Sequence, residues 1–335
     1  MERYTLDTTL REVYCDPLLE HLRRYLIYRP DRDAPERDHP DLIGRFPDKP
    51  LRDCGDAWAA EGVLKGLNLL AREVERGRLE QVFLYKGEDC ADDPMKKDVN
   101  LIRLLPEGEP AANAKKPAVI LIGGGAYLWV STIIESLPTA VHMVDRGYTV
   151  YLLTHRVNTD RAALKALDDL AAAVKHVTGV CGDGYALGAF SAGANLICNF
   201  GVSALGYQKY GLPKPAALFP VYAFIDLKTE FRHSCVHDLL RPMFGEEVQR
   251  CVDEYNIVER IDKDYPPCYI VCGRDDMSVP PYNSETLARL LAEASVPAVL
   301  EEGDHAPHAF GEGTGTDVEG WPERAIDFLE GLETR

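Results

Sequence analysis

The sequence has few basic residues for its content of acidic ones. It contains 37 Lys and Arg against 54 Asp and Glu, which gives a formal net charge of −17. A field of this sign repels phosphate backbones and anionic lipid headgroups, so the composition argues against binding to nucleic acid or to a membrane surface. We therefore expect neither nucleic acid nor membrane as a partner.

Paired cysteines and uninterrupted apolar runs are also missing. The 9 cysteines are odd in number and include no C-x-x-C pair, a pattern typical of free thiols in a reducing compartment. Residues 1–16 are charged throughout and lack the apolar stretch of a signal peptide. Two uncharged runs, 117–134 and 184–208, are interrupted by glycines, and a strand followed by a turn explains each better than a membrane span. These features predict a cytoplasmic location and no transmembrane segment.

With 335 residues, of which 46% are hydrophobic, the chain can bury a full core, and one large domain with attachments is the simplest expectation. The first part of the chain has helical apolar spacing, at Leu18, Leu19, Leu22 and Leu26 and again at Leu64, Leu67, Leu70 and Val74. Residues 29–56, rich in Pro, Asp and Arg, separate the two patterns. Residues 1–80 are therefore predicted to be an accessory helical region.

From residue 81 to residue 335 short apolar runs alternate with helical patterns. Strands are predicted at 81–86, 99–105, 117–122, 148–153, 185–190, 216–221, 268–272 and 297–301. Helices are predicted at about 135–146, 161–178, 192–204, 283–294 and 321–333. This alternation is typical of an α/β fold with a doubly wound, mainly parallel sheet covered by helices on both faces. Residues 222–265 lack a strand pattern and are predicted to form a small helical insertion that caps the site.

Ligands of such sheets bind outside the carboxyl ends of the strands, and one predicted strand end carries a reactive side chain. In the segment 186–196, ALGAFSAGANL, an apolar strand meets Ser191 and continues into a helix. Small residues lie two positions before the serine, at Ala189, and two positions after it, at Gly193, as in a nucleophile elbow. The elbow usually has glycine at the first of these positions. The alternative, a helix start capped by Ser191, is weakened by the partner residues that follow in the chain.

A serine hydroxyl becomes a nucleophile only when a base removes its proton, and elbows of this kind take an acid and then a histidine from later loops. Asp275 and Asp276 directly follow the strand predicted at 268–272, and His305 and His308 lie in the glycine-rich loop after the last strand. The spacing G-x-x-D-x-x-V-P favours Asp276 over Asp275, which would then be a turn former. His308 is favoured over His305 because it lies in the less polar part of its loop.

The anion that forms when a serine attacks a carbonyl group needs hydrogen-bond donors already in place. One donor is expected from the amide that follows the nucleophile, Ala192, and others from the loop LIGGGAY, 121–127, where Gly124 and Gly125 are the favoured donors. The alternative, a phosphate cradle, is weak because the run is neither G-x-G-x-x-G nor a P-loop.

Four segments together resemble a known family: GGGAYLWVS (123–131), AFSAGAN (189–195), GRDDMSVPPYNS (273–284) and HAFGEGTGT (308–316). In this order they are similar to the bacterial α/β-hydrolases of the acetyl-xylan esterase and feruloyl-esterase-like group, near the carboxylesterase and lipase branch. The resemblance covers about residues 81–333. It implies a serine esterase with Ser191, Asp276 and His308 as its triad. Two positions depart from the pattern: Ala189 replaces the elbow glycine, and Ile122 replaces the His or Pro that often precedes the glycines.

The resulting hypothesis is hydrolysis of a small acyl or carbohydrate acetyl ester through an acyl-enzyme, with a small-molecule ester as substrate and no cofactor or metal. A peptidase, a thioesterase and a non-catalytic ligand-binding homologue remain as alternatives, and the oligomeric state, including a homo-oligomer, is left open. Aromatic residues next to the motifs are either pocket walls or core: Tyr127, Trp129, Tyr222 and Phe310. His233 and His237 have a spacing that can bind zinc, but a surface or cap pair is the favoured interpretation because no third ligand is evident.

Overall fold

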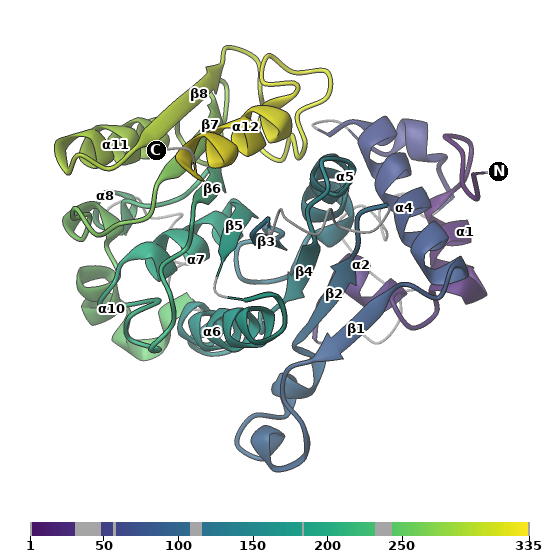
Figure 1. Ribbon diagram of the computed structural model, residues 1–335, viewed down its shortest axis with the longest axis horizontal. Coiled ribbons are helices and arrows are strands. Elements are labelled where there is room, and N and C mark those ends of the chain that lie inside the picture. Colours follow the sequence, from purple (N-terminus) through teal and green to yellow (C-terminus); the bar gives the residue numbers. More distant parts are fainter. Residues whose placement is uncertain are drawn as a thin grey trace.

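The computed structural model describes residues 2–30, 48–55, 58–107, 116–182, 184–231 and 243–333. Within these residues the strands form one 8-stranded sheet in the order β1-β2-β4-β3-β5-β6-β7-β8 (Figure 1). The strands from β4 to β8 in this order are parallel, whereas β1 and β2 are added antiparallel at one edge. The strands are β1 (Glu80–Phe83), β2 (Asn100–Leu104), β3 (Ala118–Ile122), β4 (Val150–Thr154), β5 (Tyr185–Phe190), β6 (Leu218–Val221), β7 (Cys268–Gly273) and β8 (Ala298–Gly303).

The central strands are buried on both faces, which explains their uninterrupted apolar sequences. All residues of β3, β4, β5, β6 and β7 are buried. Successive side chains alternate between two hydrophobic clusters: in β3, Val119 and Leu121 face one, and Ile120 and Ile122 face the other. A core on each side of the sheet is what a doubly wound fold requires, so the predicted fold class is confirmed.

One face of the sheet is covered by α4 (Ala60–Glu75), α5 (Leu137–Asp145) and α12 (Trp321–Glu333). The short N-terminal helices share this cluster: α1 (Leu10–Cys15), η1 (Pro17–Leu19), α2 (Arg23–Leu26) and η2 (Leu51–Asp53). Helix α4 packs closely on α5, because a Cβ on Gly66 would lie 2.9 Å from Leu137 Cγ. The described parts of residues 1–80 are therefore joined to the same core as the sheet. Of the irregular connection predicted at 29–56, residues 31–47, 56 and 57 lie outside the described chain.

The other face is covered by α6 (Ala162–Cys181), α7 (Ala192–Gly201), α10 (Val248–Glu254) and α11 (Tyr282–Glu293). The segment 222–265 contains α8 (Leu227–Phe231), η6 (Gly245–Glu247), α10 and η7 (Ile257–Glu259). Its described part contributes Phe244, Val252 and Tyr265 to the core on this face. Residues 232–242 are not described, so a cap formed by this segment stays a prediction. The remaining short helices are η3 (Gly87–Cys90), η4 (Pro94–Asp98) and the π-helical turn η5 (Thr132–Ser136).

The N-terminal region also contacts the loop that follows β3. Tyr28 and Val130 form an isolated antiparallel bridge, in which each backbone N–H donates to the carbonyl of the other at 3.0 Å. The buried Tyr28 hydroxyl donates to Asp98 at 3.1 Å, and Arg24 pairs with the same carboxylate at 2.9 Å. These contacts connect residues before α4 to the glycine-rich loop of residues 123–131.

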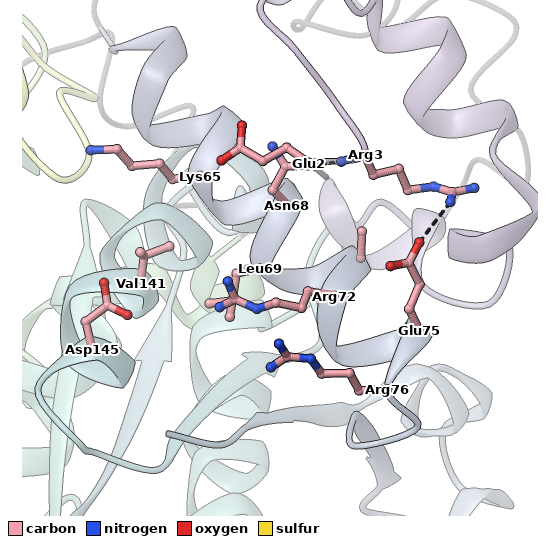
Figure 2. A pocket seen from close by; sticks show the side chains of 11 residues that line it. Glu2, Arg3, Lys65, Asn68, Leu69, Arg72, Glu75, Arg76, Val141 and Asp145 are labelled. Atoms are coloured by element: carbon pink, nitrogen blue, oxygen red, sulfur yellow. Dashed lines mark hydrogen bonds and ion pairs between the residues drawn. The ribbon is translucent and has the colours of Figure 1, made fainter. Parts of the chain in front are cut away.

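A polar pocket of about 490 Å³ lies between α4, α5 and the first residues of the chain (Figure 2). Its walls include Lys65 and Arg72 from α4, Arg76 directly after it, and Val141 and Asp145 from α5. Helix α5 begins near the carboxyl ends of the strands and runs back along the sheet, so its residues 141–145 lie toward the opposite end. This pocket is therefore separate from the edge where the sequence motifs gather.

No helix among the described residues combines the length and the apolarity that a membrane crossing needs.

An ionisable cluster joins α5, α12 and the loop that carries His308. His142 Nδ1 lies 2.5 Å from Glu323 Oε1, and His142 Nε2 lies 3.5 Å from Glu312 Oε2. Burial of His142 opposes its charge, but hydrogen bonds to Glu312 and Glu323 outweigh burial and raise its pKa. A folded-state pKa above the unfolded value of about 6.5 means that the cluster stabilises the fold below that pH and loses this contribution as the pH rises through the folded pKa.

We therefore expect His142→Gln to lower the melting temperature more at about pH 6 than at about pH 9, and thermal denaturation at both pH values measures this. His176→Gln, on α6 and outside the cluster, is the matched control. An equal loss at both pH values would show that the charge of His142 does not contribute.

Candidate active site

Ser191 lies at the sharp turn between β5 and α7. Its φ of 51° and ψ of −118° form a conformation that residues with a side chain rarely adopt, at a cost of about 1–3 kcal/mol. The turn is crowded, since a Cβ on Gly193 would lie 2.7 Å from the carbonyl oxygen of Gly123. Gly193 therefore has to be glycine, whereas the methyl group of Ala189 is accommodated in the core, fully buried.

His308 lies between Ser191 and Asp276. Its Nδ1 is 2.7 Å from Asp276 Oδ2, and its Nε2 is 3.1 Å from Ser191 Oγ. A carboxylate only accepts hydrogen bonds, so Nδ1 carries the proton and Nε2 is left to accept from the serine hydroxyl. Asp276 is only 4% exposed, and its other oxygen accepts from the amides of Ser278 and Val279, both at 2.8 Å. The three side chains thus form a continuous line with fixed orientation.

The two neighbouring residues that the sequence offered as alternatives form a separate pair. His305 Nδ1 is 2.8 Å from Asp275 Oδ2, and the amide of Ala306 donates to Asp275 Oδ1 at 2.8 Å. The His305 side chain is 70% exposed. This pair holds the loop after β8 against the loop after β7, while His308 is the histidine that reaches Ser191.

The glycine loop packs directly on the serine turn. A Cβ on Gly124 would lie 2.9 Å from Ser191 Cβ and 3.0 Å from the carbonyl oxygen of Phe190. The amide of Gly124, however, donates to the buried carboxylate of Glu135 at 2.5 Å. The prediction that Gly124 donates to a substrate anion is therefore wrong for this structure, because the donor is already engaged. The amides of Gly125 and Ala192 donate to no acceptor in the described part of the chain and remain available.

The site lies where the sheet changes its direction of winding. The chain leaves β3 toward β4 on one side, while β5, which leads to Ser191, lies on the other side of β3. Ligand sites of open α/β sheets form at this switch point, outside the carboxyl ends of the strands. The glycine loop follows β3 and the serine follows β5, so both belong to it.

The four aromatic residues singled out in the sequence differ in exposure. Tyr127, Tyr222 and Phe310 are at most 2% exposed, and the Tyr127 hydroxyl donates to Asn195 at 2.9 Å within the core. For these three the pocket prediction is wrong, because their rings are packed too tightly to present a surface to a ligand. Tyr222 nevertheless borders the site, with its ring centroid 4.7 Å from that of His308. Trp129 is partly exposed and lies beside Gly125.

Glu135 is the residue of this site that the sequence analysis missed. It is 3% exposed, on the π-helical turn η5. Burial raises its pKa to about 7, although hydrogen bonds from Gly124 and Tyr222 and the nearby His308 act in the opposite direction. The available signal was its position, since it is the sole Asp, Glu, Lys or Arg in residues 117–144.

Within the described residues no group of three His, Cys, Asp or Glu side chains is arranged to hold a metal ion. The histidine pair His233 and His237 lies outside the described residues.

Solved structures share this fold at low sequence identity. An acetyl ester-xyloside bifunctional hydrolase from Caldicellulosiruptor lactoaceticus is 18% identical, with a TM-score of 0.63 over 76% of this chain and 96% of the other. The carboxylesterase Cest-2923 from Lactobacillus plantarum is 18% identical, with a TM-score of 0.59 over 70% and 94%. A sugar hydrolase from Lactococcus lactis is 24% identical, with a TM-score of 0.58 over 70% and 95%. At these identities the likeness shows the fold alone.

A comparison with curated proteins gives no match. The family model BD-FAE matches residues 108–291, which include the glycine loop, Ser191 and Asp276. This match covers more than half of the 335 residues and agrees with the resemblance found in the motifs. The chain therefore belongs to the BD-FAE family, on an α/β-hydrolase fold.

Proposed function

We propose that this protein is a serine hydrolase that cleaves carboxylic esters through an acyl-enzyme. The observation that carries the proposal is the line from Ser191 Oγ through His308 to Asp276, beside two unengaged backbone amides. A hydroxyl on a strained turn, a correctly oriented imidazole and preformed donors are the parts that acyl transfer from an ester needs.

The reaction follows from this arrangement. Ser191 Oγ attacks the ester carbonyl carbon while its proton moves to His308 Nε2, and the amides of Gly125 and Ala192 stabilise the negative oxygen. The imidazolium then protonates the leaving alcohol, which departs and leaves the acyl group on Ser191. His308 next removes a proton from water, which attacks the acyl-enzyme, and returns that proton to Ser191 Oγ as the carboxylic acid leaves. Asp276 keeps the imidazole in the required tautomer throughout.

The substrate class is part of the proposal. The similar structures are named as an acetyl ester-xyloside hydrolase, a carboxylesterase and a sugar hydrolase, which supports small acyl or carbohydrate acetyl esters. A peptidase and a thioesterase would use the same three side chains, so substrate tests have to separate them.

The test combines covalent labelling with a substrate panel. A fluorophosphonate probe is expected to label the wild type on Ser191, detected by intact mass and peptide mapping, and Ser191→Ala is expected to remain unlabelled. Acetate esters of p-nitrophenol and of sugars are expected to be hydrolysed faster than the matching amides and thioesters. Absence of labelling in correctly folded wild type would contradict the proposal and favour a ligand-binding homologue.

A further inference from the structure

Glu135 makes two hydrogen bonds that the mechanism above does not use. Its Oε2 accepts from the amide of Gly124 at 2.5 Å, and its Oε1 accepts from the hydroxyl of Tyr222 at 2.9 Å. These partners are 11 and 87 residues away in the sequence. One side chain thus joins the turn before α5, the glycine loop after β3 and the segment after β6.

Burying a carboxyl group at this position carries a desolvation penalty. Removing such a group from water destabilises the fold unless the group is hydrogen-bonded, and an apolar side chain of similar size would avoid this penalty. The raised pKa of Glu135 reflects that burial. The carboxyl group provides two acceptors, one for the Gly124 amide and one for the Tyr222 hydroxyl. An apolar side chain would provide neither.

The first of these donors, the Gly124 amide, lies one residue before the Gly125 amide. Glu135 fixes the peptide unit before the Gly124 Cα, and the amide of Ser131, which donates to the Gly124 carbonyl oxygen at 3.0 Å, fixes the one after it. That second unit contains the Gly125 N–H. In a trans peptide the carbonyl and the N–H point in opposite directions, so holding the Gly124 oxygen on one side directs the Gly125 N–H to the other.

The second donor acts on the histidine. Tyr222 has a φ of 39°, which is unusual for a residue with a side chain and is maintained by its surroundings. Its hydroxyl is held by Glu135, and its ring lies against both His308 and Phe310, with centroid separations of 4.7 and 4.8 Å. A fixed Tyr222 ring limits the orientations that the imidazole can adopt.

We infer that Glu135 is a positioning residue for ester hydrolysis at this site, because its buried carboxyl group anchors Gly124, the residue before the Gly125 amide, and holds Tyr222 against His308. The inference rests on the proposed function. Glu135 touches no reacting atom, and its effect is on the geometry in which the negative oxygen and the imidazolium form. Its removal should therefore affect the transition state more than substrate binding.

The test compares Glu135→Ala, Glu135→Gln and Glu135→Asp with the wild type. Steady-state hydrolysis of p-nitrophenyl acetate gives kcat and KM, and thermal denaturation monitors folding. Misdirecting one donor of the negative oxygen costs about 10²–10³ in rate, so Glu135→Ala is expected to lower kcat by about 10²-fold with KM changed less than about threefold. The affinity for phenylboronic acid, which forms a tetrahedral anion on the serine, should fall with kcat.

The other two variants distinguish the length of the Glu135 side chain from its carboxyl group. Glu135→Gln keeps the length and an acceptor for Gly124, and is expected to recover kcat to within about tenfold of the wild type. Glu135→Asp keeps the carboxyl group but is one methylene too short to reach both donors, and is expected to resemble Glu135→Ala. Tyr222→Phe removes the second bond, together with the backbone hydrogen bond between Gly311 and the tyrosine hydroxyl, but keeps the bond to Gly124, and is expected to lose less than about tenfold.

A folded Glu135→Ala with wild-type kcat, or a Glu135→Asp as active as Glu135→Gln, would overturn the inference and leave the proposed function intact. If Glu135→Ala does not fold, the comparison of Gln with Asp decides. A folded wild type that neither hydrolyses esters nor reacts with the fluorophosphonate probe would overturn the proposed function and this inference together.

Discussion

Replacement of Ser191 by alanine is expected to lower kcat for ester hydrolysis by about 10⁶-fold, and His308→Ala is expected to cost about as much. The two side chains share one proton transfer across the 3.1 Å contact between Oγ and Nε2, so neither is useful without the other. We therefore expect the double variant to be no slower than either single variant. Residual activity in all three would come from the amides of Gly125 and Ala192 and from substrate binding.

The measurement is steady-state hydrolysis of p-nitrophenyl acetate by highly purified variants, because traces of wild type would hide a loss of this size. His305→Ala, which removes the exposed histidine of the same loop, is the matched control and should retain most of the activity. Additive losses in the double variant would show that Ser191 and His308 act independently and would contradict the proposed mechanism.

Asp276→Asn is expected to lower kcat by about 10⁴-fold while leaving the fold intact. An asparagine amide can present an N–H to the imidazole at the 2.7 Å contact, which favours the tautomer with the proton on Nε2. In that tautomer His308 cannot accept the proton of Ser191. The pH dependence of kcat/KM and the rate of fluorophosphonate labelling both measure this effect, because each depends on a basic Nε2.

The preceding residue provides the control. Asp275→Asn has the same chemical change one position away, but it acts on His305 and the amide of Ala306, so a loss of less than about tenfold is expected. Equal losses in the two variants would show that the acid loop as a whole, and not the contact of Asp276 with His308, supports activity.

The sheet could be predicted because its strands are buried on both faces. A strand with two buried faces has an uninterrupted apolar sequence, and the prediction for 185–190 coincides with β5, Tyr185–Phe190. The helix predicted at 321–333 likewise coincides with α12. The strand predicted at 81–86 extends beyond β1, which ends at Phe83, because an antiparallel edge strand has only one neighbour to define its length.

The position of the site could also be predicted, but its internal hydrogen bonds could not. Small residues around Ser191 and a glycine run after β3 are local patterns with a steric cause, and the structure brings them together. The bond between Glu135 and Gly124 depends on how the turn before α5 folds back under the glycine loop, which no spacing rule describes. The same applies to Tyr127, which is buried in the core with its hydroxyl bonded to Asn195, 68 residues later in the chain.

The bridge between Tyr28 and Val130 affects the flexibility of the glycine-rich loop. A run of three glycines would be expected to sample many conformations, and ordering it during each catalytic cycle would cost entropy. Here two backbone hydrogen bonds join the loop to the segment around Tyr28, which is anchored through Asp98. This segment restricts the loop in addition to the bonds that Gly124 makes with Glu135 and Ser131. The segment before α4 thereby restricts the conformations of a loop that its glycines would otherwise leave flexible.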